Sequence, residues 1–162
     1  MAATKKKTST KKAPADAIAL LKQDHQKVKG LLESLERATG ARRTKLLGQI
    51  EKELEVHTTI EEEIFYPAYY KAAKKKDDQV MYYEAVAEHR VVEMVLPQAG
   101  EGETNEDLKA KAKVLKELVE HHADEEEKDM FPRARQVMER EELRELGTRM
   151  EARKKELMGR AG

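Results

Sequence analysis

The chain has 162 residues, of which 40% are charged, 39% hydrophobic and 4% aromatic, which fits one domain built from long amphipathic helices. The absence of Cys excludes disulfides, thiolate zinc sites, iron–sulfur clusters and cysteine nucleophiles, so any bound metal must use nitrogen and oxygen ligands. The formal net charge is zero, and neither a secretory signal nor a bilayer-spanning run of roughly 20 apolar residues is found, so a cytoplasmic location is expected.

The first 15 residues differ in composition from the rest of the chain. They carry five Lys and no acid, which leaves 27 basic and 32 acidic side chains for the remainder. Such a segment buries too little apolar surface to offset its ordering entropy, and we predict a disordered tail over residues 1–15. Its lysines could contact nucleic acid or an acidic partner, but a solvated tail is favoured because no aromatic side chain accompanies them.

Beyond the tail, apolar residues recur at helical spacing. In chain order they predict helices over about residues 15–40, 42–74, 77–96 and 105–132, followed by a charged helical segment over residues 139–158. Pro67 predicts a bend or break in the second helix, and Pro97 ends the third. Short connections between long helices favour antiparallel neighbours, so the predicted fold is all-α, an up-down-up-down four-helix bundle. The expected division is a tail (1–15), a metal-binding bundle (16–138) and a charged C-terminal helical extension (139–162).

One motif occurs in both halves of the chain. The segment HTTIEEEIFYP, residues 57–67, is similar to HADEEEKDMFP, residues 122–132. Each copy sets a histidine four residues before a glutamate, and another histidine lies 32 or 33 residues before the copy. The six residues of the pattern are His25, His57, Glu61, His89, His122 and Glu126.

This pattern has the chemistry of a metal centre. Residues i and i+4 of a helix lie about 40° apart on one face, and the bundle topology turns the two half-repeats toward each other. Imidazole and carboxylate ligands suit iron, manganese or zinc, and three protein ligands per metal leave open positions for a small molecule. We predict a dinuclear centre with four terminal histidines and two glutamates as bridges or terminal oxygens. Two iron ions are preferred, because open positions at a paired site favour oxygen or peroxide chemistry, and manganese and zinc stay open.

The order His…His-x-x-x-Glu…His…His-x-x-x-Glu, with the Phe-(Tyr)-Pro endings, resembles the hemerythrin-like HHE cation-binding domain over residues 16–138. The resemblance implies a four-helix bundle around a non-heme di-iron site that binds oxygen, nitric oxide or peroxide. It carries all six residues of the pattern over as ligands. The sequence is particularly similar to the small bacterial hemerythrin-like proteins, some of which show catalase-type activity.

The resemblance to the oxygen-carrying hemerythrins is weaker. Glu93 stands where that branch has a second histidine after His89, and Glu127 stands where it has an aspartate after His122. A site richer in carboxylates holds Fe(III) better and suits reversible oxygen carriage less. Peroxide decomposition, iron handling or sensing is therefore favoured. Glu93 shares a helix face with His89 and stays an additional candidate ligand.

Other polar residues near the pattern are given lesser roles. His121 is one residue out of register and is expected to face solvent or to support a ligand from outside. Asp24 and Glu88 precede the leading histidines and could orient a ligand, but surface roles are favoured for both. Glu62 and Glu127 are expected on a solvated face, although both are duplicated and could assist the ligands. The five tyrosines are expected to pack in the core, although one near the metals could donate a hydrogen bond or an electron to bound peroxide.

The favoured function is catalase-like decomposition of a small oxidant, with hydrogen peroxide, oxygen or nitric oxide as the ligand. The alternative is a non-catalytic iron-binding or oxygen-sensing module whose helices order when metal binds. A purely structural bundle is the third reading, and it requires that no metal bind. No Ser-His-Asp order, phosphate loop or nucleotide fingerprint occurs, which disfavours hydrolytic and nucleotide-dependent chemistry. No membrane partner is expected, and protein partners and the oligomeric state stay open.

Overall fold

The computed structural model describes residues 14–160, and every regular element in this range is helical. The α-helices are α1 (Ala17–Arg37), α2 (Gly40–Ile60), α3 (Tyr66–Ala72), α4 (Lys76–Val95), α5 (Asn105–Glu125), α6 (Phe131–Val137) and α7 (Arg140–Gly159). Two π-helical segments, η1 (Glu61–Phe65) and η3 (Glu126–Met130), and one 3-10 segment, η2 (Leu96–Gly100), complete the list. The predicted disordered tail lies outside the described residues, apart from its last two. Within the described range, no helix combines the length and the apolar character needed to cross a membrane.

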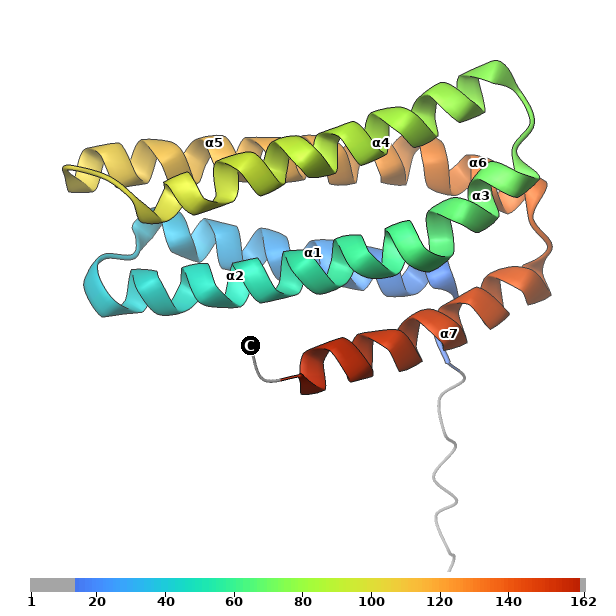
Figure 1. Cartoon of the computed structure of the whole chain (residues 1–162), viewed down its shortest axis with the longest axis horizontal. Helices are drawn as coiled ribbons and strands as arrows, with labels where there is room; N and C mark the ends of the chain where they lie inside the picture. The colour runs from blue at the N-terminus through green and yellow to red at the C-terminus, as the bar shows by residue number, and fades with distance from the viewer. Residues whose placement is uncertain (1–13, 161–162) are drawn as a thin grey trace, which may run out of the picture.

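The four-helix bundle predicted from the sequence is confirmed. The first and third long helices are α1 and α4, whereas α2–η1–α3 and α5–η3–α6 each form one continuous rod. The pair of α1 and α2 lies against the pair of α4 and α5, with short connections between neighbours (Figure 1). Asp16 begins α1 by accepting the Ala19 N–H at 2.8 Å, and Thr104 begins α5 by accepting the Asp107 N–H at 3.1 Å.

Pro67 does not break the second rod. Instead, the helix widens into the π-helical turn of η1, and Pro67 follows in the first turn of α3. The second half does the same, with Pro132 in the first turn of α6 after η3. Proline lacks an N–H and fits the first turn of a helix, so both prolines are compatible with a rod that restarts after a wide turn.

The bundle core is divided into two apolar clusters. One lies toward α3, α6 and α7 and includes Ile18, Leu21, Ile60, Tyr69, Phe131, Leu146 and Met150. The other lies toward the opposite end and includes Leu32, Leu35, Ile50, Ala112, Leu115 and Val119. Buried polar residues lie where the rods pass from one cluster to the other, between or next to the cluster residues: His25, His57, Glu61, His89, His122 and Glu126. A polar layer therefore crosses the bundle between the two apolar clusters.

Helix α7 lies along the outer side of the α1–α2 pair (Figure 1). Leu146 and Met150 are buried in the first apolar cluster. Gly147 faces the start of α1 so closely that a Cβ there would lie 2.5 Å from the Ala15 carbonyl oxygen. The charged extension therefore packs on the bundle, while the domain boundary at residue 139 stays a prediction.

Candidate metal centre

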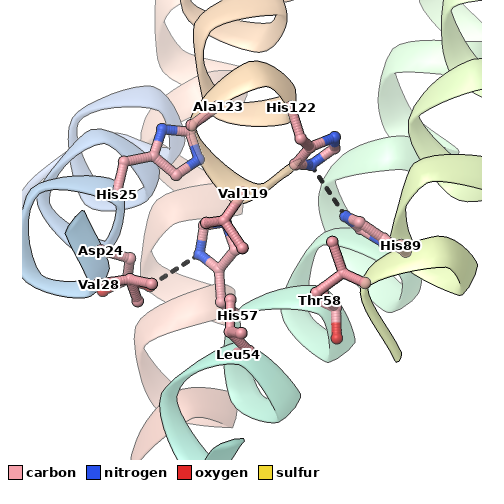
Figure 2. A pocket seen from close by; sticks show the side chains of 11 residues that line it. Asp24, His25, Val28, Leu54, His57, Thr58, His89, Val119, His122 and Ala123 are labelled. Carbon is pink, nitrogen blue, oxygen red and sulfur yellow. Dashed lines mark hydrogen bonds and ion pairs between the residues drawn. The ribbon is translucent and has the colours of Figure 1, made fainter. Parts of the chain in front are cut away.

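The polar layer brings all six residues of the repeated pattern together in the bundle interior. His25 comes from α1, His57 and Glu61 from the second rod, His89 from α4, and His122 and Glu126 from the fourth rod. All six are less than a tenth exposed. Figure 2 shows the four imidazole rings converging from four separate elements. They form two groups that could each hold a metal ion.

The first group consists of His25, His57, Glu61 and Glu126. The His57 Nε2 atom lies 3.0 Å from Glu61 Oε1, and the His25 Nε2 atom lies 3.1 Å from Glu126 Oε2. All four atoms are buried, and none makes an aligned hydrogen bond beyond these close contacts with one another. Buried polar atoms without aligned hydrogen bonds are costly for a fold. A cation among them would satisfy all four, so the residues fit a metal.

The second group consists of Glu61, His89 and His122. The Nε2 atoms of the two histidines lie 3.0 Å apart, and His89 Nε2 lies 3.1 Å from Glu61 Oε2. The other carboxylate also takes part, because Glu126 Oε1 lies 3.5 Å from His122 Nε2. Glu61 and Glu126 therefore turn one oxygen toward each group, so each carboxylate could contact a cation in either group.

Tyr66 places a hydroxyl inside the second group. Its oxygen lies 2.5 Å from Glu126 Oε1, 3.2 Å from His89 Nε2, 3.4 Å from Glu61 Oε2 and 3.5 Å from His122 Nε2. The phenol is fully buried, and burial together with the Glu126 charge raises its pKa well above the usual value. Because this oxygen is within 3.5 Å of every atom of the second group that could bind a metal, it could bind the same cation or form a hydrogen bond to a small molecule bound there.

Helical spacing alone does not distinguish Tyr66 from the other four tyrosines. A signal for it exists, because the duplicated motif has Tyr66 before Pro67 and Phe131 before Pro132. Phe131 lies at the first group, where its ring stacks on His25 at 5.9 Å between centroids. The two halves thus differ at equivalent positions by one hydroxyl, and that hydroxyl is the one in the centre.

Each of the four histidines holds a carboxylate at its outer ring nitrogen, Nδ1. The pairs are His25 with Glu127 (2.8 Å), His57 with Asp24 (3.2 Å), His89 with Glu62 (2.8 Å) and His122 with Glu88 (2.5 Å). A carboxylate accepts the Nδ1 proton, fixes the ring and leaves Nε2 free to bind metal. The surface roles favoured for Asp24 and Glu88, and the solvated face expected for Glu62 and Glu127, are therefore wrong. Contacts between rods, which the sequence does not display, turn these side chains inward.

The charges of the metal-free centre are tightly coupled. Burial opposes a charge on His57, but the Glu61 charge and the hydrogen bond to Asp24 outweigh it and raise the pKa of His57 to about 10. The pKa of His122 is likewise raised to about 9, against burial, chiefly by the Glu126 charge. Burial would raise the pKa of Glu61, but the neighbouring imidazoles hold it well below its usual value. Imidazolium–carboxylate pairs thus occupy the centre when no cation is bound.

A small cavity adjoins the histidines on one side (Figure 2). Its volume is about 20 Å³, room for a water-sized or diatomic molecule. All four histidines line it, together with apolar side chains that include Val28, Leu54, Val92 and Val119. A ligand in this cavity would approach the four histidines past apolar side chains.

Two of the residues discussed from the sequence lie outside the buried groups. Glu93, the additional candidate ligand, is about half exposed and pairs with Arg90 at 2.7 Å. His121 faces solvent, with its side chain 63% exposed, and contacts Glu88 and Glu125. The solvent-facing reading of His121 is confirmed, and the structure does not bring Glu93 to the centre.

Comparisons with known proteins agree with this geometry. The chain is similar to an uncharacterized protein of Mycobacterium tuberculosis (strain H37Rv) and to one of Mycobacterium bovis, each 31% identical over 147 residues that cover 89% of this chain and 88% of the relative. It is also 27% identical over 147 residues to a DNA nickase of Nostoc, of which the match covers 40%. The family model described as the hemerythrin HHE cation binding domain matches residues 16–134, the range that holds both buried groups. The chain belongs to the hemerythrin HHE cation-binding family.

Proposed function

We propose that this protein holds two non-heme iron ions in its polar layer and uses them to bind and decompose a small oxidant, with hydrogen peroxide favoured. The observation that carries the proposal is the set of four buried atoms that converge without an aligned hydrogen bond, His25 Nε2, His57 Nε2, Glu61 Oε1 and Glu126 Oε2. A polar cluster that is incomplete without a cation is costly for a purely structural bundle.

The assignment of ligands follows the two groups. His25, His57 and one oxygen from each glutamate would hold one ion, and His89, His122 and the remaining two oxygens would hold the other. The Tyr66 oxygen lies within reach of the second group. Nitrogen and oxygen ligands with open positions suit iron, and manganese and zinc are the alternatives that a metal analysis must exclude.

The residues around the ions explain how such a site can handle peroxide. When bound, a pair of iron ions could take two electrons from one hydrogen peroxide, which leaves as oxygen, and pass them to a second, which becomes two molecules of water. The Nδ1 carboxylates hold each imidazole in one orientation, which keeps the ligands in place through changes of charge. The cavity beside the histidines has room for a small molecule, and its exposed lining is apolar, which suits a small neutral ligand. Tyr66 holds a proton within reach of the donor atoms of the second group.

The test is metal content followed by oxygen release. Iron-reconstituted protein is expected to contain two irons per chain and to release oxygen from hydrogen peroxide faster than the same amount of free iron. Glu126→Gln removes a bridging carboxylate and should lower the rate by more than about tenfold. Glu93→Gln is the matched control, because its carboxylate lies outside the centre, and should behave as the unchanged protein. A rate no better than that of free iron would sink the catalytic reading.

One observation supports the non-catalytic alternative, an iron-dependent sensor. Asp24 contacts the ligand His57 on one side and Lys154 of α7 on the other, so the centre is linked to an outer helix. If sensing is the function, iron binding should change the rate at which a protease cleaves α7 while peroxide turnover stays absent. Unchanged cleavage of the metal-free and iron-loaded protein would count against this alternative.

A further inference from the structure

A second cluster of metal-binding side chains lies on the surface next to the centre. Glu88 of α4 and His121 and Glu125 of α5 offer three ligand atoms that lie within 4.8 Å of one another. His121 Nε2 is 3.2 Å from Glu125 Oε1 and 3.5 Å from Glu88 Oε1. His121 and Glu125 repeat, one residue earlier, the i to i+4 spacing of the inner pair His122 and Glu126. We call Glu88, His121 and Glu125 the outer group.

Glu88 belongs to both the outer group and the centre. Its Oε1 faces His121, while its Oε2 lies 2.5 Å from Nδ1 of the buried His122. The side chain is 21% exposed, between the 63% of His121 and the 9% of His122. A single carboxylate therefore connects a solvent-facing imidazole with an imidazole of the centre.

A small cavity lies between the outer group and the buried residues of the centre. It is lined by Glu88 and Glu125 of the outer group and by His122 and Glu126 of the centre, with Met81, Ala85 and Met130 among its apolar walls. Its volume, about 10 Å³, is close to that of one water-sized particle. Glu126 is 2% exposed, and its Oε1 atom lies 3.5 Å from His122 Nε2. The cavity thus joins the surface carboxylates to two buried side chains of the centre.

The other half of the bundle has no counterpart of the outer group. The positions equivalent to His121 and Glu125 are Val56 and Ile60, both buried, and Ile60 shares an apolar cluster with residues of α7. The position equivalent to Glu88 is Asp24, which pairs with Lys154 of α7. Helix α7 therefore covers one side of the centre, and the outer group marks the side that α7 leaves open.

We propose that Glu88, His121 and Glu125 bind a divalent cation at the surface and pass it through the adjoining cavity to His122 and Glu126. The inference rests on the proposed metal centre and adds the route by which the metal enters. Two carboxylates and an imidazole suit Fe²⁺, Mn²⁺ or Zn²⁺. An acidic site of this kind raises the local concentration of cations and the rate at which they are captured. Glu88 reaches both ends, so it can exchange one contact for the other without a large movement of the backbone.

The test compares the rate of metal uptake in the full-length, metal-free protein. Zn²⁺ serves as the probe, since it is redox-inert and binds nitrogen and oxygen sites at least as tightly as Fe²⁺. Uptake is followed by competition with a coloured zinc chelator. His121→Ala and Glu125→Gln are expected to slow uptake by about tenfold while the final zinc content stays at two per chain. Glu117→Gln, two turns earlier than Glu125 on the exposed face of α5, is the matched control and should load at the rate of the unchanged protein.

A second measurement examines the outer group at equilibrium. Titration of protein already holding two zinc ions should show one further, weaker zinc ion, which His121→Ala and Glu125→Gln remove and Glu117→Gln retains. Equal uptake rates in all four proteins, or no third ion, would overturn the entry route while leaving the metal centre intact. If the unchanged protein takes up no zinc in its interior, the proposed centre and the route fail together.

Discussion

At the scale of single residues, the orientation of the four histidines is fixed by carboxylates that contact Nδ1, on the side of each ring away from Nε2. Every histidine of the centre is held through Nδ1 by a different acidic residue. Two of these contacts, those of Glu62 and Glu127, cross from one half-repeat to the other, and those of Asp24 and Glu88 stay within one half. Loss of such a partner typically weakens metal binding by roughly 10- to 100-fold, so these four acids matter nearly as much as the ligands.

The raised pKa values predict how metal binding depends on pH. His57 and His122 carry protons at neutral pH in the metal-free protein, with pKa values of about 10 and about 9. A metal ion binds only the neutral ring and must displace a proton from each of these histidines. Below these pKa values, the apparent metal affinity should therefore rise about tenfold for each unit of pH increase and each proton displaced. Chelator competition at pH 6.5, 7.0 and 7.5 measures this slope. An affinity that stays constant over this range would contradict the protonation of both histidines.

The raised pKa values also predict how the stability of the metal-free protein depends on pH. Protonated His57 and His122 stabilise the folded state, because their folded-state pKa values lie above the ordinary 6.5. This contribution is complete below about pH 6.5 and is lost as the pH rises through about 9 and 10. The metal-free protein should therefore have a lower urea midpoint at pH 10 than at pH 7. The protein with metal bound should not follow this trend, because its imidazoles are already neutral.

Tyr66 predicts a spectroscopic difference between two conservative variants. Tyr66→Phe removes the oxygen that lies within 3.5 Å of four donor atoms of the centre, and it keeps the buried ring. We expect the visible absorption of the iron-loaded protein to change. Tyr69→Phe, a buried tyrosine whose hydroxyl meets Met81 instead, should leave the spectrum unchanged. Identical spectra for Tyr66→Phe and the unchanged protein would remove Tyr66 from the centre.

At the scale of secondary-structure elements, the two π-helical turns begin at the two glutamates of the centre. The Tyr66 N–H donates to the Glu61 carbonyl, and the Phe131 N–H donates to that of Glu126, five residues back in each case. A π turn accommodates one extra residue and rotates the chain that follows, and such turns concentrate at functional sites. The rotation explains how the helix that brings Glu61 into the polar layer also brings Tyr66 there.

The sequence predicts the elements better than it predicts these details. Apolar spacing and short connections are enough for four antiparallel rods and a fifth charged helix, and the structure confirms them. The His-x-x-x-Glu repeats predict which six residues meet, and the structure brings them together, while their role as ligands stays a prediction. The π turns are not predictable from Glu61–Phe65, because the same residues can form an α-helix. The Nδ1 partners depend on how each rod is rotated about its axis, which sequence spacing alone does not specify.

Gly147 predicts how α7 responds to one added methyl group. In Gly147→Ala the new Cβ would lie 2.5 Å from the Ala15 carbonyl oxygen and 2.7 Å from the Ala17 nitrogen, so α7 must move away from α1. We expect a loss of about 1–3 kcal/mol in the free energy of unfolding. Gly159→Ala, at the end of the same helix, meets no atom within 4 Å and should cause no loss. Urea titration of both variants measures the difference, and equal stabilities would contradict the close approach.

At the scale of the whole molecule, the polar layer is a weak section between two apolar clusters until a cation joins it. Each rod contributes residues to the layer, so a bound ion connects parts of the chain that otherwise meet only through the clusters. A ligand that binds only the folded state stabilises it in proportion to the logarithm of its concentration over its Kd. Metal binding should therefore be visible in the unfolding of the entire bundle.

The corresponding prediction compares metal-free and metal-loaded protein in urea. Free metal at 100 times its Kd should raise the free energy of unfolding by about 2.7 kcal/mol for each site filled. His57→Ala and His122→Ala, one for each group, should each lose part of this increment while retaining a helical far-ultraviolet spectrum. An unfolding midpoint that does not respond to metal in the unchanged protein would argue for a purely structural bundle.

Tyr66 and Phe131 occupy equivalent positions of the two half-repeats, and this difference could be used to label the two groups with different metals. One group has the extra phenol oxygen and the open side, whereas the other has a stacked phenyl ring and the cover of α7. Two such pockets should rank metals differently, although the motif that builds them is duplicated. We expect one equivalent of Co²⁺ followed by one of Zn²⁺ to give a heterobimetallic protein, with a single paramagnetic reporter in a known half of the bundle.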